Sequence, residues 1–172
     1  RLTGGDGSDS YYVDNTGDVV NETNAVLASG GTDTVNSYLA SYTLGANVEN
    51  LRLLAAGAAN GTGNGLNNVI YAGAGNNVLD GGAGADTASY AYATAGVTAS
   101  LASAVAQATG GSGSDTLLNI ENLTGSNYND SLTFFTDNFH CFIEIISSFF
   151  QSLLAIHHSR SAHFAKVRNI SH

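Results

Sequence analysis

The sequence predicts an all-β solenoid on three observations. Residues 63–89 keep a strict nine-residue phase, and copies of the same unit occur on both sides of that run. The composition is rich in glycine, with 21 Gly in 172 residues and only 11% charged side chains. Such a chain suits short strands joined by turns around a thin core better than a thick globular core.

Three nine-residue units begin at Gly63, Ala72 and Gly81. Nine residues are too few for a helical hairpin and do not fit a heptad, but they fit a six-residue turn and a three-residue strand. Glycine supplies the turn conformations that other residues reach only at a cost. Side chains alternate in a strand, so the apolar position eight points inward. In the three units, position six is Asn68, Asn77 and Asp86, and position eight is Ile70, Leu79 and Ala88.

Copies of the unit lie outside that run. Residues 4–12 and 110–118 match G-G-x-G-x-D-x-apolar-x at every fixed position, and weaker copies end with the segments 31–35 and 128–132. A longer duplication contains N-x-E-N-L twice, as Asn47-Val48-Glu49-Asn50-Leu51 and as Asn119-Ile120-Glu121-Asn122-Leu123. One unit buries almost nothing alone, whereas stacked units share a core.

These units resemble the nonapeptide repeats of RTX, or haemolysin-type, calcium-binding proteins. The resemblance covers residues 1–133 and implies a right-handed parallel β-roll in which two nonapeptides form one coil. In that family calcium lies between stacked turns, held by glycine-loop carbonyls and position-six side chains. The metal-binding positions that the resemblance implies are Gly4, Gly5, Gly7, Asp9, Asp33, Asn68, Asn77, Gly81, Gly82, Gly84, Asp86, Gly110, Gly111, Gly113, Asp115 and Asp130.

The clearest stacked pair that the family pattern implies is the turn 63–68 with the turn 81–86. Asn68 and Asp86 would then face one calcium ion. Asn68 and Asn77 depart from the motif because they offer an oxygen without a charge, which predicts weaker binding, at about 10⁻⁴ to 10⁻³ M. The alternative is that both asparagines only form turns.

Stretches between the repeats are rich in β-branched and aromatic residues and predict further strands. They are 11–13, 18–20, 35–44, 48–54 and 87–101. Tyr38 and Tyr42 suggest a sugar-binding surface, and the simpler interpretation is that the aromatic residues cover a narrow core.

Charge and residue types exclude several functions. The formal net charge is −9, and residues 1–133 carry twelve acidic side chains against Arg1 and Arg52. No basic patch is available to bind nucleic acid. No His or Cys lies in residues 1–133, so we expect no enzyme activity in this chain. An acidic chain repels itself and gains little stability from modest apolar burial. We therefore expect it to be loose without metal and to fold on binding metal.

The composition changes after residue 133: all seven Phe, all five His and the single Cys follow it. Apolar residues from Phe139 to Ile156 recur at the period of an amphipathic helix, which polar residues interrupt too often for a membrane span. His140 and Cys141 match no zinc signature. Residues 134–172 therefore predict a non-repeat, helical tail with three open origins: a cap on the roll, an export signal, or foreign sequence.

The function that the resemblance implies is a calcium-dependent folding and secretion module of a larger extracellular bacterial protein. Its expected partners are calcium and a type I export machinery. Arg1-Leu2-Thr3 runs straight into a repeat, which predicts a piece of a longer chain. One alternative is an adhesive or carbohydrate-binding solenoid that contacts a polysaccharide or cell surface. Another is the accessory domain of a secreted lipase, protease or epimerase.

Overall fold

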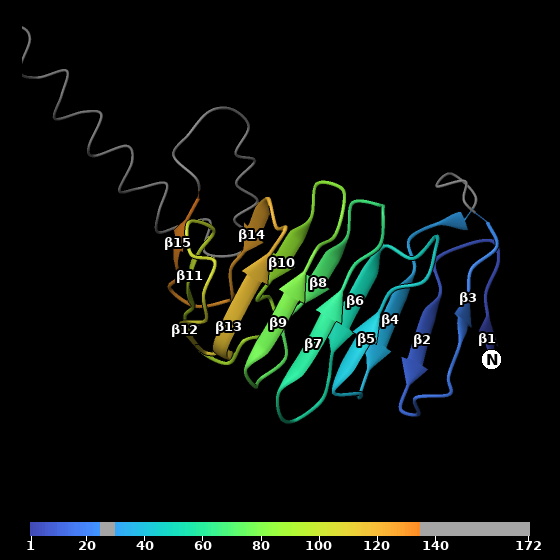
Figure 1. The fold of residues 1–172 in the computed structure, drawn as a ribbon, viewed down its shortest axis with the longest axis horizontal. Helices are drawn as coiled ribbons and strands as arrows, with labels where there is room; N and C mark the ends of the chain where they lie inside the picture. The colour runs from blue at the N-terminus through green and yellow to red at the C-terminus, as the bar shows by residue number, and fades with distance from the viewer. Residues whose placement is uncertain (25–29, 135–172) are drawn as a thin grey trace, which may run out of the picture.

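The computed structural model of the protein describes residues 1–24 and 30–134, and its regular structure there is nearly all β-strand. Two sheets form two facing layers (Figure 1). In spatial order, the larger sheet contains β14 (Asn122–Thr124), β10 (Thr87–Ser89), β8 (Val69–Tyr71), β6 (Asn50–Leu53), β4 (Thr34–Ser37) and β2 (Ser10–Val13). The smaller sheet contains β12 (Gln107–Gly110), β13 (Gly113–Leu118), β9 (Asn77–Asp80), β7 (Ala59–Thr62) and β5 (Ser41–Thr43).

Successive strands from β4 to β10 alternate between the two sheets, so the chain advances along the long axis one coil at a time (Figure 1). Short parallel pairs lie at the two ends: β1 (Leu2–Thr3) with β3 (Val20–Asn21), and β11 (Thr98–Ser100) with β15 (Ser131–Thr133). The predicted parallel β-roll is confirmed. The helix predicted for the tail lies outside the described residues, and no described helix is long and apolar enough to cross a membrane.

The nine-residue phase produces the strands that the sequence predicts. β8, β9 and β10 each follow a glycine-rich turn, and their position-eight residues Ile70, Leu79 and Ala88 are fully buried. Here, residues that face each other on neighbouring strands of one sheet are 18 positions apart in the sequence, which is two nonapeptides. The stacking of the turn 63–68 on the turn 81–86 is present, because Val69 pairs with Thr87.

Other coils differ in length, so the predicted strand boundaries fail there. Residues that occupy the same place in successive coils are separated there by other lengths of chain. The separation is 24 positions from Asp9 to Asp33, 16 from Asp33 to Glu49, and 35 from Asp86 to Glu121. The predicted strand 35–44 is two strands, β4 and β5. The predicted strand 87–101 is β10, an irregular segment and β11. The strand predicted at 18–20 shifts to β3. A narrow roll permits only a few residues before the chain must turn to the opposite sheet.

Residues 110–118 also differ from the predicted nonapeptide. They do not form a turn followed by a three-residue strand: β12 and β13 pair as an antiparallel hairpin with an irregular register between Ala108 and Gly110. Asp115 therefore lies within β13. The long coil between β10 and β14 has enough chain to form this hairpin, whereas an 18-residue coil does not.

Close stacking of the two central turns makes Gly63 a sensitive position. A methyl group there would collide with the carbonyl oxygen of Gly81 and with Oδ1 of Asn68. We expect Gly63→Ala to lower the free energy of unfolding by about 1–3 kcal/mol, because overpacking forces the coils apart. Gly65→Ala is the matched control, since nothing lies within 4 Å of the position its methyl would take. Urea denaturation measures both; equal midpoints would contradict the close stacking.

Candidate metal centres

Acidic and amide side chains form a line along one edge of the larger sheet, each immediately before a strand. We call this line the polar ladder: Asp9, Asp33, Glu49, Asn68, Asp86 and Glu121. Four of its backbone amides donate to the side chain of the next member of the ladder. The donor to acceptor distances are 2.8 Å for Asp9 N to Asp33 Oδ1, 2.8 Å for Asp33 N to Glu49 Oε2, 2.7 Å for Asn68 N to Asp86 Oδ1, and 2.7 Å for Asp86 N to Glu121 Oε2.

Glu49 and Glu121 are members of the polar ladder that the sequence analysis did not assign. Both belong to the duplicated N-x-E-N-L segment, and that duplication was the available signal. In each copy the asparagine two positions earlier adopts a left-handed conformation, with φ of 62° at Asn47 and 50° at Asn119. Asparagine tolerates that conformation better than most residues do. The duplicated segment therefore aims a glutamate at the amide of a position-six aspartate.

The N-terminal end of the polar ladder gathers three carboxylates. One carboxylate oxygen from each of Asp9, Glu22 and Asp33 lies within 4.8 Å of the other two. The Tyr11 hydroxyl donates to Glu22 Oε1, while Glu22 Oε2 is buried with no hydrogen-bond partner among the described residues. Burial raises the pKa of Asp33, and the nearby charges of Glu22, Glu49 and Asp9 raise it further against the opposing hydrogen bond from Asp9 N. The sequence predicted Asp9 and Asp33 here but missed Glu22, which lies outside any nonapeptide.

The opposite edge of the roll places Asn77 beside Asp115. Asn77 N donates to Asp115 Oδ1 over 2.8 Å, and Asn77 Nδ2 donates to the carbonyl of Ala59 over 2.9 Å. Burial raises the pKa of Asp115 to about 6 despite hydrogen bonds that lower it, including the one from the Thr109 hydroxyl. Burial, followed by the Asp115 charge, raises the pKa of Tyr90. These two predicted ligands thus lie far from the polar ladder, on the other sheet.

The remaining predicted positions are Asp130 and the glycines of the turns, whose part in metal binding stays a prediction. Asp130 is exposed and accepts hydrogen bonds from the backbone of Ser126 and Val97, which ties two turns together. Among the predicted site glycines, positive φ angles occur at Gly7, Gly82, Gly84, Gly110 and Gly113. Gly4, Gly81 and Gly111 lie against neighbouring backbone or side chains, whereas Gly5 is open on its Cβ side.

A sequence model describing the RTX calcium-binding nonapeptide repeat matches residues 62–89, in four copies. Residues 62–89 are RTX repeats. The match covers the strictly phased turns and the strands β8, β9 and β10. The RTX motif therefore assigns calcium binding as the chemistry of this repeat class. Neither a curated protein nor a solved structure matches the chain.

The matched RTX segment fits calcium poorly on the side that faces the preceding coil. Asn64 Nδ2 donates to the carbonyls of Gly45 and Val48 over 2.7 and 2.8 Å. Asn68 Nδ2 donates to the carbonyls of Val48 and Glu49, both over 3.1 Å. Oxygens that could coordinate a cation are thus already hydrogen-bonded to neutral amides. At this turn, amide hydrogens satisfy the loop oxygens without metal.

On the side that faces the following coil, the RTX segment retains one uncompensated charge. Asp86 Oδ2 is buried without a hydrogen-bond partner among the described residues and lies against Gly81. Burial raises the pKa of Asp86, and the charges of Glu121 and Asp80 add to the effect. The structure brings Asp86 and Asn68 together as predicted, but through a hydrogen bond from the Asn68 amide to the carboxylate. Glu121, which the sequence analysis missed, is the second carboxylate beside Asp86.

Proposed function

We propose that this protein is a calcium-dependent folding module of a secreted protein. The observation that carries the proposal is the presence of buried carboxylate oxygens with no partner, at Glu22 and Asp86. The only Lys or Arg residues among the described residues are Arg1 and Arg52, and Arg52 stacks over Tyr92. Burying unpaired negative charge is costly, and a divalent cation held by oxygens would offset that cost.

Binding would be coupled to folding, because the carboxylates converge only when the coils stack. At a calcium concentration 100 times the dissociation constant, each site would add about 2.7 kcal/mol to the stability of the folded state. The folded state would therefore be less stable where calcium is scarce and more stable where calcium is abundant. This behaviour suits a bacterial protein that passes through an export machinery before it folds outside the cell. The proposed role is structural and involves no catalysis by this chain.

Circular dichroism of the full chain during a calcium titration tests the proposal. In chelator we expect a reduced β signal and a low melting temperature, and between about 10⁻⁴ and 10⁻³ M calcium we expect both to rise. Magnesium at the same concentrations is the control, because it dehydrates reluctantly and prefers strict octahedral sites. An identical spectrum and melting temperature with chelator and with calcium would overturn the proposed function.

A further inference from the structure

We propose that the principal calcium site of this protein is formed by Asp9, Glu22 and Asp33, outside the segment that matches the RTX repeat. The inference rests on the proposed function, since it names where the folding cation binds. The family pattern implies calcium at several turns, with the stacked turns 63–68 and 81–86 as the clearest pair and with Asp9 and Asp33 among the other positions. The structure favours the N-terminal end of the polar ladder as the principal site, because Glu22 supplies a third carboxylate there from outside the repeats.

The three carboxylates surround one small space. Their oxygens lie within 4.8 Å of one another, which matches oxygens bound to a single calcium, since each lies about 2.3–2.6 Å from the ion. Gly4 forms one wall of this space. A methyl group on Gly4 would collide with the Tyr11 hydroxyl, Glu22 Oε1 and Asp9 Oδ2 together. The glycine therefore leaves room where acidic and phenolic oxygens converge.

Hydrogen bonding within the cluster leaves oxygens free for a cation. Asp33 uses Oδ1 to accept from Asp9 N, and Glu22 uses Oε1 to accept from Tyr11. Glu22 is only 7% exposed, yet its Oε2 has no donor among the described residues. A buried carboxylate oxygen normally has a hydrogen-bond donor or a metal ion as its partner. An oxygen-seeking cation is the partner that this geometry lacks.

Glu22 also explains how calcium binding can survive the loss of charge in the central repeats. Each adjacent pair along the polar ladder offers at most two carboxylates, and Asn68 leaves a single carboxylate in each of its two pairs, with Glu49 and with Asp86. Glu22 follows β3 and lies within the coil that joins Asp9 to Asp33, which is 24 positions long rather than 18. The longer coil provides the chain that carries Glu22. Three carboxylates give this site more ligand charge than the amide-filled turn at Asn68, which favours tighter calcium binding.

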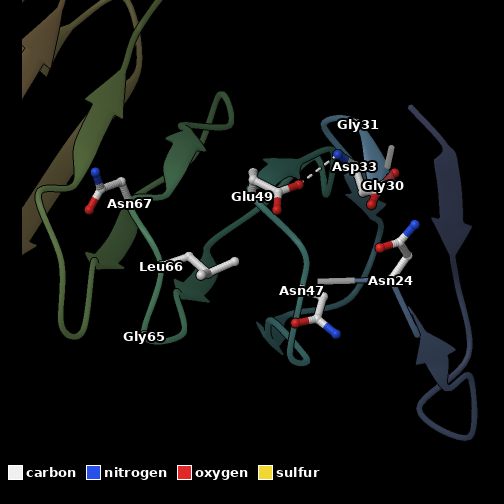
Figure 2. Close-up of a pocket in the computed structure, with 9 residues that line it drawn as sticks. All are labelled: Asn24, Gly30, Gly31, Asp33, Asn47, Glu49, Gly65, Leu66 and Asn67. Atoms are coloured by element: carbon white, nitrogen blue, oxygen red, sulfur yellow. Dashed lines mark hydrogen bonds between the residues drawn. The ribbon is translucent and has the colours of Figure 1, made fainter. Parts of the chain in front are cut away.

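The site also has access to solvent on one side. Beside Asp33 lies a pocket of about 400 Å³, lined also by Asn47, Glu49 and Leu66. Figure 2 shows Asp33 and Glu49 on facing segments of this pocket, joined by the hydrogen bond from the Asp33 amide. Calcium usually completes its six to eight oxygen ligands with water. The pocket provides space for such water molecules next to Asp33, the one residue of the three that lines it.

Isothermal titration of calcium into the full chain tests the site with Glu22→Gln. Glutamine keeps the size of the side chain and removes the charge, so we expect at least a tenfold weaker affinity at the tightest site. The matched control is Asp14→Asn, which removes one charge from an exposed position in the same region and should leave the affinity unchanged. Terbium provides a second measurement, because tyrosine next to a bound terbium ion sensitises its luminescence. Tyr11→Phe should reduce that emission, whereas Tyr128→Phe, at the other end of the roll, should not.

The outcomes separate the site from the function. If calcium orders the wild-type chain and Glu22→Gln responds at the same calcium concentration, this site is wrong and the proposed function stands. If the wild-type chain shows no response to calcium, the proposed function fails, and the site fails with it. Equal loss of affinity in Glu22→Gln and Asp14→Asn would show that net charge alone sets the affinity, which also overturns the site. A selective loss in Glu22→Gln supports both.

Discussion

Replacing Asn68 with aspartate is expected to destabilise the calcium-free protein by about 3 kcal/mol. The Asn68 side chain is only 1% exposed and donates to two backbone carbonyls, at Val48 and Glu49. Aspartate cannot donate there, so both hydrogen bonds are lost, at about 0.5–1.5 kcal/mol each. The two carbonyls keep other donors, the Asn64 side chain and the Val69 amide, but a buried carboxylate oxygen would now face them without a partner, which adds to the cost. The new carboxylate would also lie close to Asp86, whose Oδ1 accepts from the Asn68 amide. Urea denaturation in chelator measures the loss.

Calcium should reverse much of that loss, because Asn68→Asp restores the carboxylate of the full RTX motif. The variant should therefore gain more stability from millimolar calcium than the wild-type protein does. Asn67→Asp is the matched control: Asn67 is exposed and uses Oδ1 to accept from the Ala85 amide, a bond that aspartate preserves. If Asn68→Asp and Asn67→Asp were equally stable in chelator, the Asn68 amide would not be what closes this turn.

The importance of Asn68 could not be settled from the sequence, although its position could. The nine-residue phase predicts the stacked turns and the buried residues Ile70 and Leu79, because both follow from a fixed period and alternating side chains. It does not reveal which atoms of an asparagine face the neighbouring coil. If the side-chain oxygen of Asn68 faced the preceding coil, it could bind a cation. The side-chain amide nitrogen faces that coil instead and donates hydrogen bonds to the carbonyls that a cation would otherwise bind. Only the positions of Val48 and Glu49 decide between these two roles.

Coil length explains most of the remaining differences between the sequence analysis and the structure. Three contiguous nonapeptides, two to a coil, occupy residues 63–89, and the predicted strands are correct there. Elsewhere the chain between equivalent positions varies from 16 to 35 residues, and no local pattern reports how much chain a coil contains. Glu22 was therefore missed, because its approach to Asp9 depends on the path of a long coil. Glu121 was missed for a similar reason, although its repeated N-x-E-N-L context was visible.

Acidification is expected to stabilise the calcium-free protein, raising its melting temperature by several degrees between pH 7.5 and pH 5. Burial raises the pKa values of Asp33, Asp86 and Asp115 in the folded state, to about 6 for Asp115. In the unfolded chain these groups titrate near their ordinary value of about 3.9. The folded state therefore binds more protons between these pH values, and the free energy of unfolding falls as pH rises. This stabilisation is complete below the unfolded pKa and is lost as pH rises through about 6.

Protons and calcium should act as alternatives, since each neutralises a buried carboxylate. The stabilisation by calcium should therefore shrink at pH 5, where ligands must release protons to bind the ion. Asp115→Asn isolates one group: Oδ1 can still accept from the Asn77 amide, and the variant imitates the protonated acid. We expect its calcium-free melting temperature to be higher than wild type at pH 7.5 and to depend less on pH between 4 and 6. Asp14→Asn is the exposed control.

A calcium-free wild-type protein that melts at a lower temperature at pH 5 than at pH 7.5 would show that its buried carboxylates are stabilised as charged groups. The electrostatic basis of the calcium requirement would then be wrong.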